Sequence, residues 1–472
     1  MRIGRMLTVA VITAGCAIIG AGGPAAAHPA GTLQVRNHRP DVRVPFVTRH
    51  AGEAVVDLRA AAPGTDWATP GAESAVVSIS VDGRYATDLV VSGSRPLARQ
   101  LALGRLAIGV HTLKLHFAAD RSPVDEAGVR IDRLRVTTYD KRDPEFQILR
   151  FAPIMYGRNL PELGTRFQSA TTDVPLIAWH EITPAATAGH TVLTYSLIWS
   201  NEDGGTNTPA LMARWGRTTD IEWTYAVELD EHGERVPGSD TYQAANHQTL
   251  HYTGAYEGDH PRLETCTSNN NMCDVVDDPM RFFLSTLPTL PAGQPREHLM
   301  DTNPWTYQIM AKEMTREGKI EIPSPYAVST PEVSDQRNYL YAAVSKTTQG
   351  VNSGTSWVGV ALGVKLTGGD TVYLSHHVDP TWSIQRDVPA ATTVELPAGT
   401  TLDDIAAVSV HRIVNGTDTG APIQVTALSR GFLLDDSYLP GPSLLNWTGA
   451  VELTAASPSA VVWTCLLYTP DP

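Results

Sequence analysis

The stretch from Ile198 to Leu229 decides the fold, and it reads I-W-S-N-E-D-G-G-T-N-T-P-A-L-M-A-R-W-G-R-T-T-D-I-E-W-T-Y-A-V-E-L. Its last ten residues alternate between a polar set and an apolar set. Successive side chains of a strand leave opposite faces, so this pattern predicts a strand with one acidic and one apolar face. The polar set is Asp220, Glu222, Thr224, Ala226 and Glu228, and the apolar set is Ile221, Trp223, Tyr225, Val227 and Leu229. The whole stretch is interpreted as two strands joined by a turn-rich loop.

Working outward, the chain contains 38 Gly and 33 Pro and few long helical patterns. Many short strands joined by turns are therefore expected. The predicted fold class is mainly β, a multi-domain β-sandwich or jelly-roll architecture with a few short helices in the central block. The expected segments are a secretory signal peptide at 1–27, an N-terminal β-sandwich at 32–140, a central β-rich domain at 143–331 and a C-terminal β-sandwich at 338–472. The last block either folds alone or completes the central sheets.

In the N-terminal block, Val76 to Val81 is followed by Asp82-Gly83, the residues that a tight type I′ hairpin turn requires. A later strand reads G-V-H-T-L-K-L-H-F from Gly109 to Phe117. These two elements resemble the accessory jelly-roll modules of secreted carbohydrate-active proteins.

The central block opens with Arg150-Phe151-Ala152-Pro153-Ile154-Met155-Tyr156 and carries the D-I-E-W-T-Y-A-V-E-L strand. It resembles the Vps62-like family (proteins related to the vacuolar-sorting protein 62), which has an R-[FY]-A-P-x-x-Y element and a D-W-E-x-V-x-V-x-L strand. The Trp follows the Glu here and does not stand between the two acids, so the strand departs from the family pattern. The resemblance implies a β-rich body more than a defined activity.

Helices are expected at two places in the central block. Asp278-Pro279 provides an acidic N-cap followed by Pro and predicts a short helix. A longer helix is expected to begin at Asn303-Pro304 and to end at Gly318.

The N-terminus predicts export. Arg2 and Arg5 precede an apolar stretch, and Ala25-Ala26-Ala27 offers a cleavage site after Ala27, before His28. Cys16 gives the alternative of a lipoprotein anchor. No later segment has the ~20 continuous apolar residues that a transmembrane helix needs. The chain has 36 Lys and Arg against 50 Asp and Glu, so nucleic acid is an unexpected partner.

Cysteine spacing predicts one disulfide. Cys266 and Cys273 bracket the polar loop T-S-N-N-N-M, and an exported protein matures in an oxidising compartment. Cys465 is flanked by apolar residues and is expected to be buried and inert.

The candidate catalytic residues are Asp220 and Glu222, with Glu181 as a third acid. Residues two apart on a strand project to one face roughly 7 Å apart, which allows paired carboxylates to act as acid and base or to share a Ca²⁺. The alternative is the solvated face of an amphipathic strand. The aromatic and His residues close to these acids in the sequence predict substrate contacts, and they are Trp179, His180, Trp199 and Trp215.

Asn201, Glu202 and Asp203 are predicted to bind a metal, and Ca²⁺ suits such an oxygen-rich loop. The alternative for this segment is a plain hairpin turn. No organic cofactor is expected. His247 and His251 would chelate zinc only on a helix, and their neighbours favour a strand, on which they lie about 13 Å apart.

The sequence has no G-x-S-x-G, H-E-x-x-H, Walker A or dinucleotide motif, which disfavours several enzyme classes. Two hypotheses remain. The protein is a secreted glycan-active hydrolase with paired carboxylates, or a non-catalytic secreted protein that binds a polysaccharide or a cell-surface partner and holds structural Ca²⁺. In both, the partner is an extracellular polysaccharide or cell-surface glycan.

Overall fold

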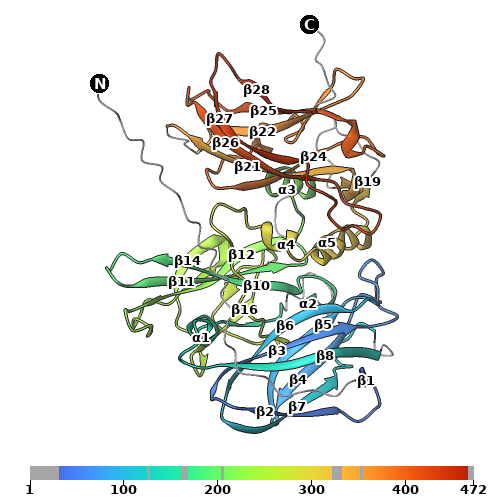
Figure 1. The fold of residues 1–472 in the computed structure, drawn as a ribbon, viewed down its shortest axis with the longest axis vertical. Helices are drawn as coiled ribbons and strands as arrows, with labels where there is room; N and C mark the ends of the chain where they lie inside the picture. The colour runs from blue at the N-terminus through green and yellow to red at the C-terminus, as the bar shows by residue number, and fades with distance from the viewer. Residues whose placement is uncertain are drawn as a thin grey trace, which may run out of the picture.

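The computed structural model describes residues 31–124, 128–158, 160, 168–202, 207–321, 332–350 and 354–465. The expected signal peptide at 1–27 lies outside these ranges, as does Asp203 of the predicted metal site. Within them the protein is mainly β, with antiparallel sheets and short helices, which confirms the predicted fold class. Figure 1 shows three layers, with the N-terminal sandwich at one end, the central domain next and the C-terminal sandwich at the other end.

The N-terminal sandwich packs a sheet of order β1-β8-β3-β6 against one of order β2-β7-β4-β5. Asp82 and Gly83 have φ values of 51° and 85°, so the hairpin between β4 and β5 turns where the sequence predicts it. The strands of this domain are β1 (Leu33–Arg36), β2 (Val42–Thr48), β3 (Gly52–Ala61), β4 (Ala75–Val81), β5 (Arg84–Val91), β6 (Leu97–Leu106), β7 (Gly109–Phe117) and β8 (Gly128–Tyr139).

The central domain is built on a meander in which five strands pair in sequence order. These are β10 (Pro175–Pro184), β11 (Thr191–Trp199), β12 (Asp220–Leu229), β13 (Thr241–Ala244) and β14 (Gln248–His251), with the short turn η2 (Ala245–His247) between the last two. A second sheet contains β9 (Ile154–Tyr156), β15 (Tyr256–Glu257), β16 (His260–Thr265), β17 (Met272–Cys273) and β18 (Arg281–Phe282).

The helices of the central domain are α1 (Glu145–Arg150), α2 (Gln168–Thr171), α3 (Thr208–Trp215), α4 (His298–Asp301) and α5 (Trp305–Arg316). Gly318 follows the end of α5 with a φ of 66°, in line with the stop that the sequence predicts for this helix. The helix expected at Asp278-Pro279 is wrong, because these residues form an irregular segment that leads into β18. The structure also has α3 in the stretch that the sequence analysis assigned to a loop.

The C-terminal block forms its own sandwich, with sheets of order β24-β21-β26-β27 and β23-β22-β25-β28. Most of its buried apolar side chains form a core of their own, while Tyr339, Tyr341, Phe432 and Leu434 belong to the core that the other two domains share. The elements are β21 (Tyr339–Thr348), β22 (Trp357–Leu366), β23 (Val372–Leu374), β24 (Ala390–Glu395), β25 (Ile405–Asn415), β26 (Ile423–Phe432), β27 (Leu445–Leu453), β28 (Ser459–Thr464) and the short turns η3 (Gln336–Asn338), η4 (Pro380–Trp382) and η5 (Leu402–Asp404). The short strands β19 (Ile320–Glu321) and β20 (Val333–Ser334) pair at the junction before it.

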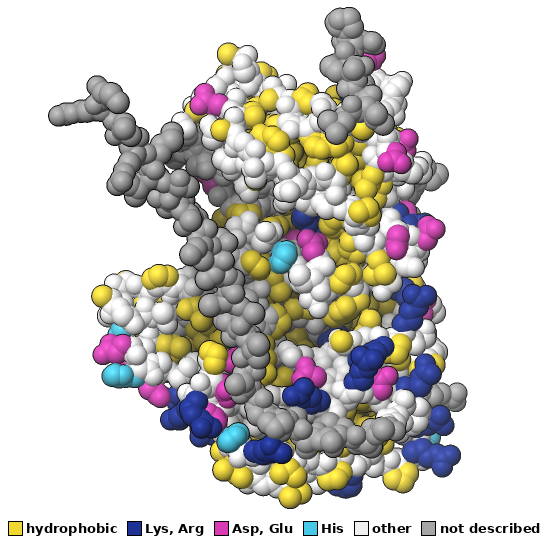
Figure 2. All heavy atoms as spheres, viewed as in Figure 1, with side chains coloured by type: hydrophobic (Ala, Val, Ile, Leu, Met, Phe, Trp, Pro, Cys, Tyr) yellow, Lys and Arg dark blue, Asp and Glu magenta, His cyan; other side chains and the backbone are white. Residues whose placement is uncertain are grey.

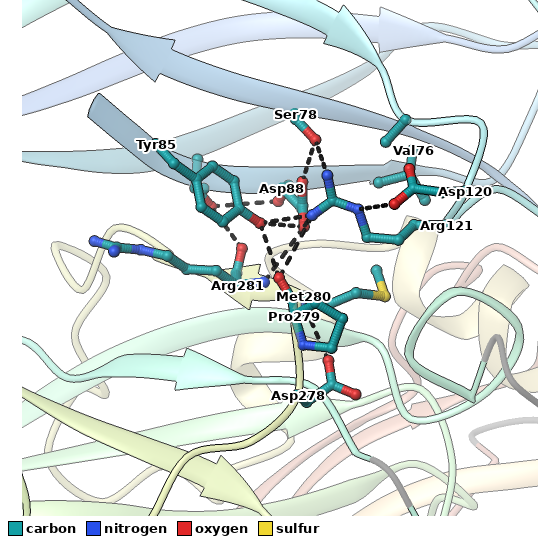
Figure 3. A network of polar contacts seen from close by, with 12 residues as sticks. Val76, Ser78, Tyr85, Asp88, Asp120, Arg121, Asp278, Pro279, Met280 and Arg281 are labelled. Atoms are coloured by element: carbon teal, nitrogen blue, oxygen red, sulfur yellow. Dashed lines mark hydrogen bonds and ion pairs between the residues drawn. The ribbon is translucent and has the colours of Figure 1, made fainter. Parts of the chain in front are cut away.

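A buried polar network joins the N-terminal sandwich to the central domain (Figure 3). The Asp88 carboxylate accepts hydrogen bonds from Ser78 Oγ at 2.7 Å, from the Arg121 guanidinium at 2.7 Å and from the Tyr85 hydroxyl. The backbone N–H of Arg281, in β18 of the central domain, donates to the same carboxylate at 3.3 Å. The first two domains are therefore held together by polar contacts as well as by their common apolar core.

The surface charge is uneven over the molecule. Figure 2 shows Lys and Arg side chains gathered over the N-terminal sandwich on the viewed face, whereas the C-terminal sandwich presents mostly apolar and uncharged groups. Exposed arginines of the N-terminal sandwich include Arg36, Arg39, Arg43, Arg49, Arg105, Arg130, Arg133 and Arg135. No helix in the described ranges is long and apolar enough to cross a membrane.

Candidate active site

A cavity of about 1110 Å³ lies where the central domain meets the C-terminal sandwich. From the central domain, the cavity is lined by the start of β12, the end of α3, the turn η2, the loop closed by the disulfide and the segment 290–297. From the C-terminal sandwich, it is lined by residues just before β24. Its wall carries charges of both signs. The acids are Glu181, Glu202, Asp220, Glu222 and Glu297, and the arginines are Arg214, Arg217, Arg296 and Arg386.

Asp220 and Glu222 both line the cavity, but the strand that carries them is not the regular amphipathic strand predicted. The register between β11 and β12 shifts between Tyr195 and Ser196, which marks a β-bulge near Thr224. A bulge puts the alternation on its two sides out of phase. Thr224 and Ala226 are accordingly buried, and Asp220 is only 1% exposed. The interpretation of these acids as a solvated strand face is therefore wrong.

Burial changes the acidity of this pair. It raises the pKa of Asp220 to about 7, and the neighbouring Glu222 charge adds to the rise, against the opposing effect of Arg217. Burial also raises the pKa of Glu222, while the hydrogen bond from Gln243 and the charges of Arg217 and Arg296 oppose the change. Two carboxyl groups with elevated pKa values in one cavity are suited to donating and accepting protons near neutral pH.

The disulfide between Cys266 and Cys273 is present, as the spacing predicts. The loop that it closes brings Asn270, which is fully buried with a φ of 47°, against Asp220. Asn270 Nδ2 donates to Asp220 Oδ2 at 3.0 Å and to the backbone oxygen of Asn201 at 3.0 Å. The disulfide loop thus holds an amide donor on the buried carboxyl group.

Glu222 is held from the other side by residues of the β13–β14 hairpin. Gln243 Nε2 donates to Glu222 Oε2 at 2.7 Å and lies 2.7 Å from His247 Nδ1, and His247 Nδ1 is 3.5 Å from Glu222 Oε1. Asn246 and His247 both have left-handed backbones, with φ of 58° and 57°, the conformation of a type I′ turn. His occupies a position where Gly is preferred, so the turn carries local backbone strain directly beside Glu222.

The arginines are placed by the end of α3. Asn207 caps the start of this helix, since its Oδ1 accepts from Ala210 N at 3.0 Å. At the other end the C-terminal sandwich satisfies the last carbonyl groups. Thr393 Oγ1 donates to Met212 O at 2.9 Å, Thr392 Oγ1 to Ala213 O at 2.5 Å and Arg386 to Arg214 O at 2.7 Å.

Trp215 lines the cavity but is covered by cations. The guanidinium carbon of Arg386 lies 3.9 Å from its ring centroid, and those of Arg214 and Arg217 each lie 5.7 Å from it. These are cation–π distances. Arg386 thus packs on Trp215, and the stacking of Trp215 on a sugar ring stays a prediction.

The other predicted substrate contacts lie in the interior. Trp179 and Trp199 are fully buried, and His180 is 8% exposed with its Nδ1 2.7 Å from Thr286 O. None of the three is among the described residues that line the cavity, so direct contact with a substrate has no geometric support. Glu181, in contrast, lines the cavity and accepts from Trp179 Nε1 at 3.3 Å.

The predicted metal ligands do not assemble in the part of the chain that is described. Asn201 is buried, and its Nδ2 donates to Glu317 Oε1 at 2.7 Å, while Glu202 lines the cavity. Asp203 lies outside the described residues. Among those that are described, no group of three or more His, Cys, Asp or Glu side chains could hold a metal ion. Ca²⁺ binding stays a prediction.

Cys465 and the pair His247 and His251 lie outside the acidic pair. Cys465 is partly exposed and not buried. His251 lies in β14, as the strand interpretation predicts, whereas His247 lies in the short turn η2 before it.

Comparison with known proteins gives remote matches. No family model matches the chain, so the resemblance to the Vps62-like family rests on the quoted residues alone. No curated protein matches either.

Among solved structures, the chain is similar to the CBM36-1 domain of a multidomain xylanase from the hindgut metagenome of Trinervitermes trinervoides (18% identity, TM-score 0.18, covering 25% of this chain and 90% of that one). It is also similar to a carbohydrate-binding module CBM36 in complex with calcium and xylotriose (16%, 0.17, 25% and 91%). A third match is a family two carbohydrate esterase from Clostridium thermocellum in complex with cellohexaose (16%, 0.16, 27% and 37%). With TM-scores this low, the likenesses carry no argument about the ligand or activity of this chain.

Sequence reasoning missed Asn270, Gln243 and the arginines of the cavity, and it considered His247 only as a metal ligand and not as a neighbour of Glu222. Two local signals predict a capped helix that ends in cations. They are Asn207 before Thr208-Pro209 at its start and the R-W-G-R run from Arg214 to Arg217 at its end. Gln243, His247 and Asn270 reach the site only through the hairpin and the disulfide loop, so no local pattern marks them.

Proposed function

We propose that this protein is an exported glycan-active hydrolase in which Asp220 and Glu222 form the carboxylate pair. The observation that carries the proposal is that both groups line one cavity of about 1110 Å³ and that the pKa of Asp220 is raised to about 7. A cavity of this volume accommodates several sugar rings of a polysaccharide.

In the proposed reaction Asp220 is the general acid, because a carboxyl group with this pKa still carries its proton near neutral pH. It gives that proton to the glycosidic oxygen as the bond from this oxygen to the anomeric carbon breaks. Glu222 acts as the base, taking a proton from the water that attacks the anomeric carbon, or as the nucleophile that this water later displaces.

Asn270, Gln243 and His247 are positioning residues in this scheme. The Asn270 amide orients the Asp220 carboxyl group, and the Gln243 amide orients Glu222 and opposes the rise of its pKa. Glu181 and Glu202 line the same cavity and are the other acids that a substrate would meet.

The test is product release from a panel of polysaccharides by the full mature chain, by Asp220→Asn and by Glu222→Gln, each with and without a chelator. We expect release by the wild-type protein and a loss of about 10²-fold or more in each variant. Release that disappears on chelation would identify a Ca²⁺-dependent enzyme, and release that survives would indicate carboxylate chemistry alone.

The control for this test is Asp436→Asn, because Asp436 is fully exposed and lies outside the cavity lining. Release by both cavity variants at the wild-type rate would exclude the assigned roles. Binding of a glycan without any release would favour the non-catalytic polysaccharide-binding protein.

A further inference from the structure

The cavity gathers four arginines whose charges are only partly neutralised. Arg217 Nε is 3.0 Å from Glu297 Oε1. Within the part of the chain that the structure describes, no carboxylate lies within ion-pair distance of Arg214, Arg296 or Arg386. Arg386 instead donates to the backbone oxygens of Arg214 and Ala391. Three guanidinium charges thus border the cavity without an acidic partner among the described residues.

These charges repel one another. Burial lowers the pKa of Arg386 to about 10, and the neighbouring charges of Arg217, Arg214 and Arg296 add to the fall, against the opposing charge of Glu297. The cluster is nevertheless held together. The Arg386 guanidinium packs 3.9 Å from the Trp215 ring centroid, those of Arg214 and Arg217 lie 5.7 Å from it, and the C-terminal sandwich caps the end of α3. The wall also carries acids, so the positive charge is local to the arginines, and a local group of guanidinium charges attracts an anion that enters the cavity.

We propose that the glycan bound in this cavity is anionic, and that Arg214, Arg296 and Arg386 bind its carboxylate or sulfate group. This inference rests on the proposed assignment of the cavity as the glycan site and adds the substrate class. Guanidinium groups match the planar oxygens of a carboxylate or sulfate and bind them in pairs of parallel hydrogen bonds. In this proposal the bond to be cleaved is held by Asp220 and Glu222, and the anionic substituent is held by the arginines that line the same cavity.

The test compares binding of charged and neutral forms of one polymer by calorimetry. The probes are polygalacturonate with its carboxyl-reduced form, and a sulfated galactan with its desulfated form. The protein is the full chain carrying Asp220→Asn, so that cleavage does not deplete the ligand. We expect at least about tenfold tighter binding of the charged member of one pair, and a preference that shrinks as salt is added.

Arg296→Gln tests the cluster directly, because Arg296 is exposed and its replacement leaves the core intact. We expect this variant to lose about tenfold in affinity for the charged polymer and nothing for the neutral one. The matched control is Arg142→Gln, which removes the same charge from an exposed arginine outside the cavity lining. Circular dichroism checks that both variants are folded.

The outcomes separate this inference from the proposed function. Equal binding of charged and neutral polymers, or equal affinities in Arg296→Gln and Arg142→Gln, overturns the anionic substrate. Cleavage of a neutral glycan in that case leaves the hydrolase proposal standing. Selective binding of an anionic polymer without cleavage by the wild-type protein supports the arginine site and overturns the hydrolase. Absence of binding to every probe overturns both.

Discussion

At the scale of single residues, Asp220 shows how a site can cost stability. Its carboxyl group is almost fully buried, and the pKa of about 7 lies above the ordinary value of 3.8. The folded state therefore binds a proton more tightly than the unfolded chain does. The stability linked to that proton is complete below pH 3.8 and is lost as the pH rises through about 7.

We predict that Asp220→Asn makes the protein more stable at pH 8 than the wild type, by roughly 2–4 kcal/mol, and changes stability little at pH 4. An uncharged amide cannot lose the proton that the folded state favours. Urea unfolding at the two pH values measures the effect. Asp436→Asn, at a fully exposed carboxylate, should show no such pH-dependent gain. Equal stability of Asp220→Asn and the wild type at both pH values would contradict the raised pKa.

His247 lowers the stability of the protein through its backbone conformation. A non-Gly residue in the left-handed region is roughly 1–2 kcal/mol less stable there than in an ordinary conformation, and Gly adopts that region freely. His247 has a φ of 57° and contacts the groups that hold Glu222. The strained backbone of His247 therefore holds the His247 side chain beside Gln243 and Glu222, where the proposed reaction uses it.

We predict that His247→Gly raises the free energy of unfolding by about 1 kcal/mol while product release falls by about tenfold or more. The acid limb of the pH–rate profile should also move to higher pH, because the Gln243 hydrogen bond that lowers the pKa of Glu222 loses its support. His38→Gly is the matched control, since His38 has a φ of 56° in an exposed turn of the N-terminal sandwich. It should gain the same stability and keep full activity. Unchanged activity and pH profile in His247→Gly would remove this residue from the site.

At the scale of elements, α3 connects two domains. Its C-cap is Gly216, with a φ of 65°, and an added Cβ there would lie 3.0 Å from the backbone N of Thr392 in β24. Gly216 is thus required both by its conformation and by the close approach of the C-terminal sandwich. Because the C-terminal sandwich lies this close to α3, Arg386 packs on Trp215 and lines one side of the cavity.

We predict that Gly216→Ala destabilises the protein by more than the roughly 1–2 kcal/mol of a left-handed Ala, and that glycan binding weakens with it. Gly318→Ala separates the two causes, because Gly318 has a φ of 66° with nothing within 4 Å of an added Cβ. Gly318→Ala should lose only the free energy of placing Ala in a left-handed conformation. Thermal unfolding and calorimetric binding of both variants provide the comparison, and equal losses would mean that the contact with β24 is unimportant.

The elements also show what could be predicted from the sequence. Alternation and turn residues predicted the strands and the Asp82-Gly83 hairpin, because side-chain period and positive φ are local properties. The position of β12 followed from the same pattern, which also predicted that Asp220 and Glu222 project to one face of the strand. The bulge near Thr224, the burial of Asp220 and the cavity did not, since they depend on register with β11 and on packing. The arginine cluster depends on Arg386, which joins α3 from 172 residues away through the domain contact.

At the scale of the whole molecule, the cavity lies between domains and therefore depends on how they are held together. The C-terminal sandwich docks through α3, and α5 packs Tyr307 against Tyr341 and Phe432 with ring centroids 5.6 and 5.7 Å apart. The N-terminal sandwich docks through the Asp88 network and an apolar core common to both domains (Figure 3). Both junctions thus combine polar contacts with buried apolar and aromatic side chains.

The Asp88 junction gives a prediction that belongs to the molecule as a whole. Asp88 is fully buried at its side chain, and Arg121 beside it is 18% exposed. Removing one partner of a buried ion pair costs about 3–5 kcal/mol. Burial raises the pKa of Asp88, so the loss of its charge offsets part of that cost and about 1–3 kcal/mol remains. We predict that Asp88→Asn destabilises the N-terminal sandwich by this amount and separates its unfolding transition from that of the rest, as seen by calorimetry.

The matched control acts on the same arginine. Asp120 lies 3.7 Å from Arg121 Nε, but its side chain is 76% exposed, so Asp120→Asn should change stability by less than about 1 kcal/mol. The cavity is lined by residues of the central domain and the C-terminal sandwich, so glycan binding should survive Asp88→Asn at temperatures below the new transition. A single cooperative transition with unchanged midpoint would show that the apolar core alone joins the two domains. Loss of glycan binding before any unfolding would instead show that the N-terminal sandwich supports the cavity across the central sheets.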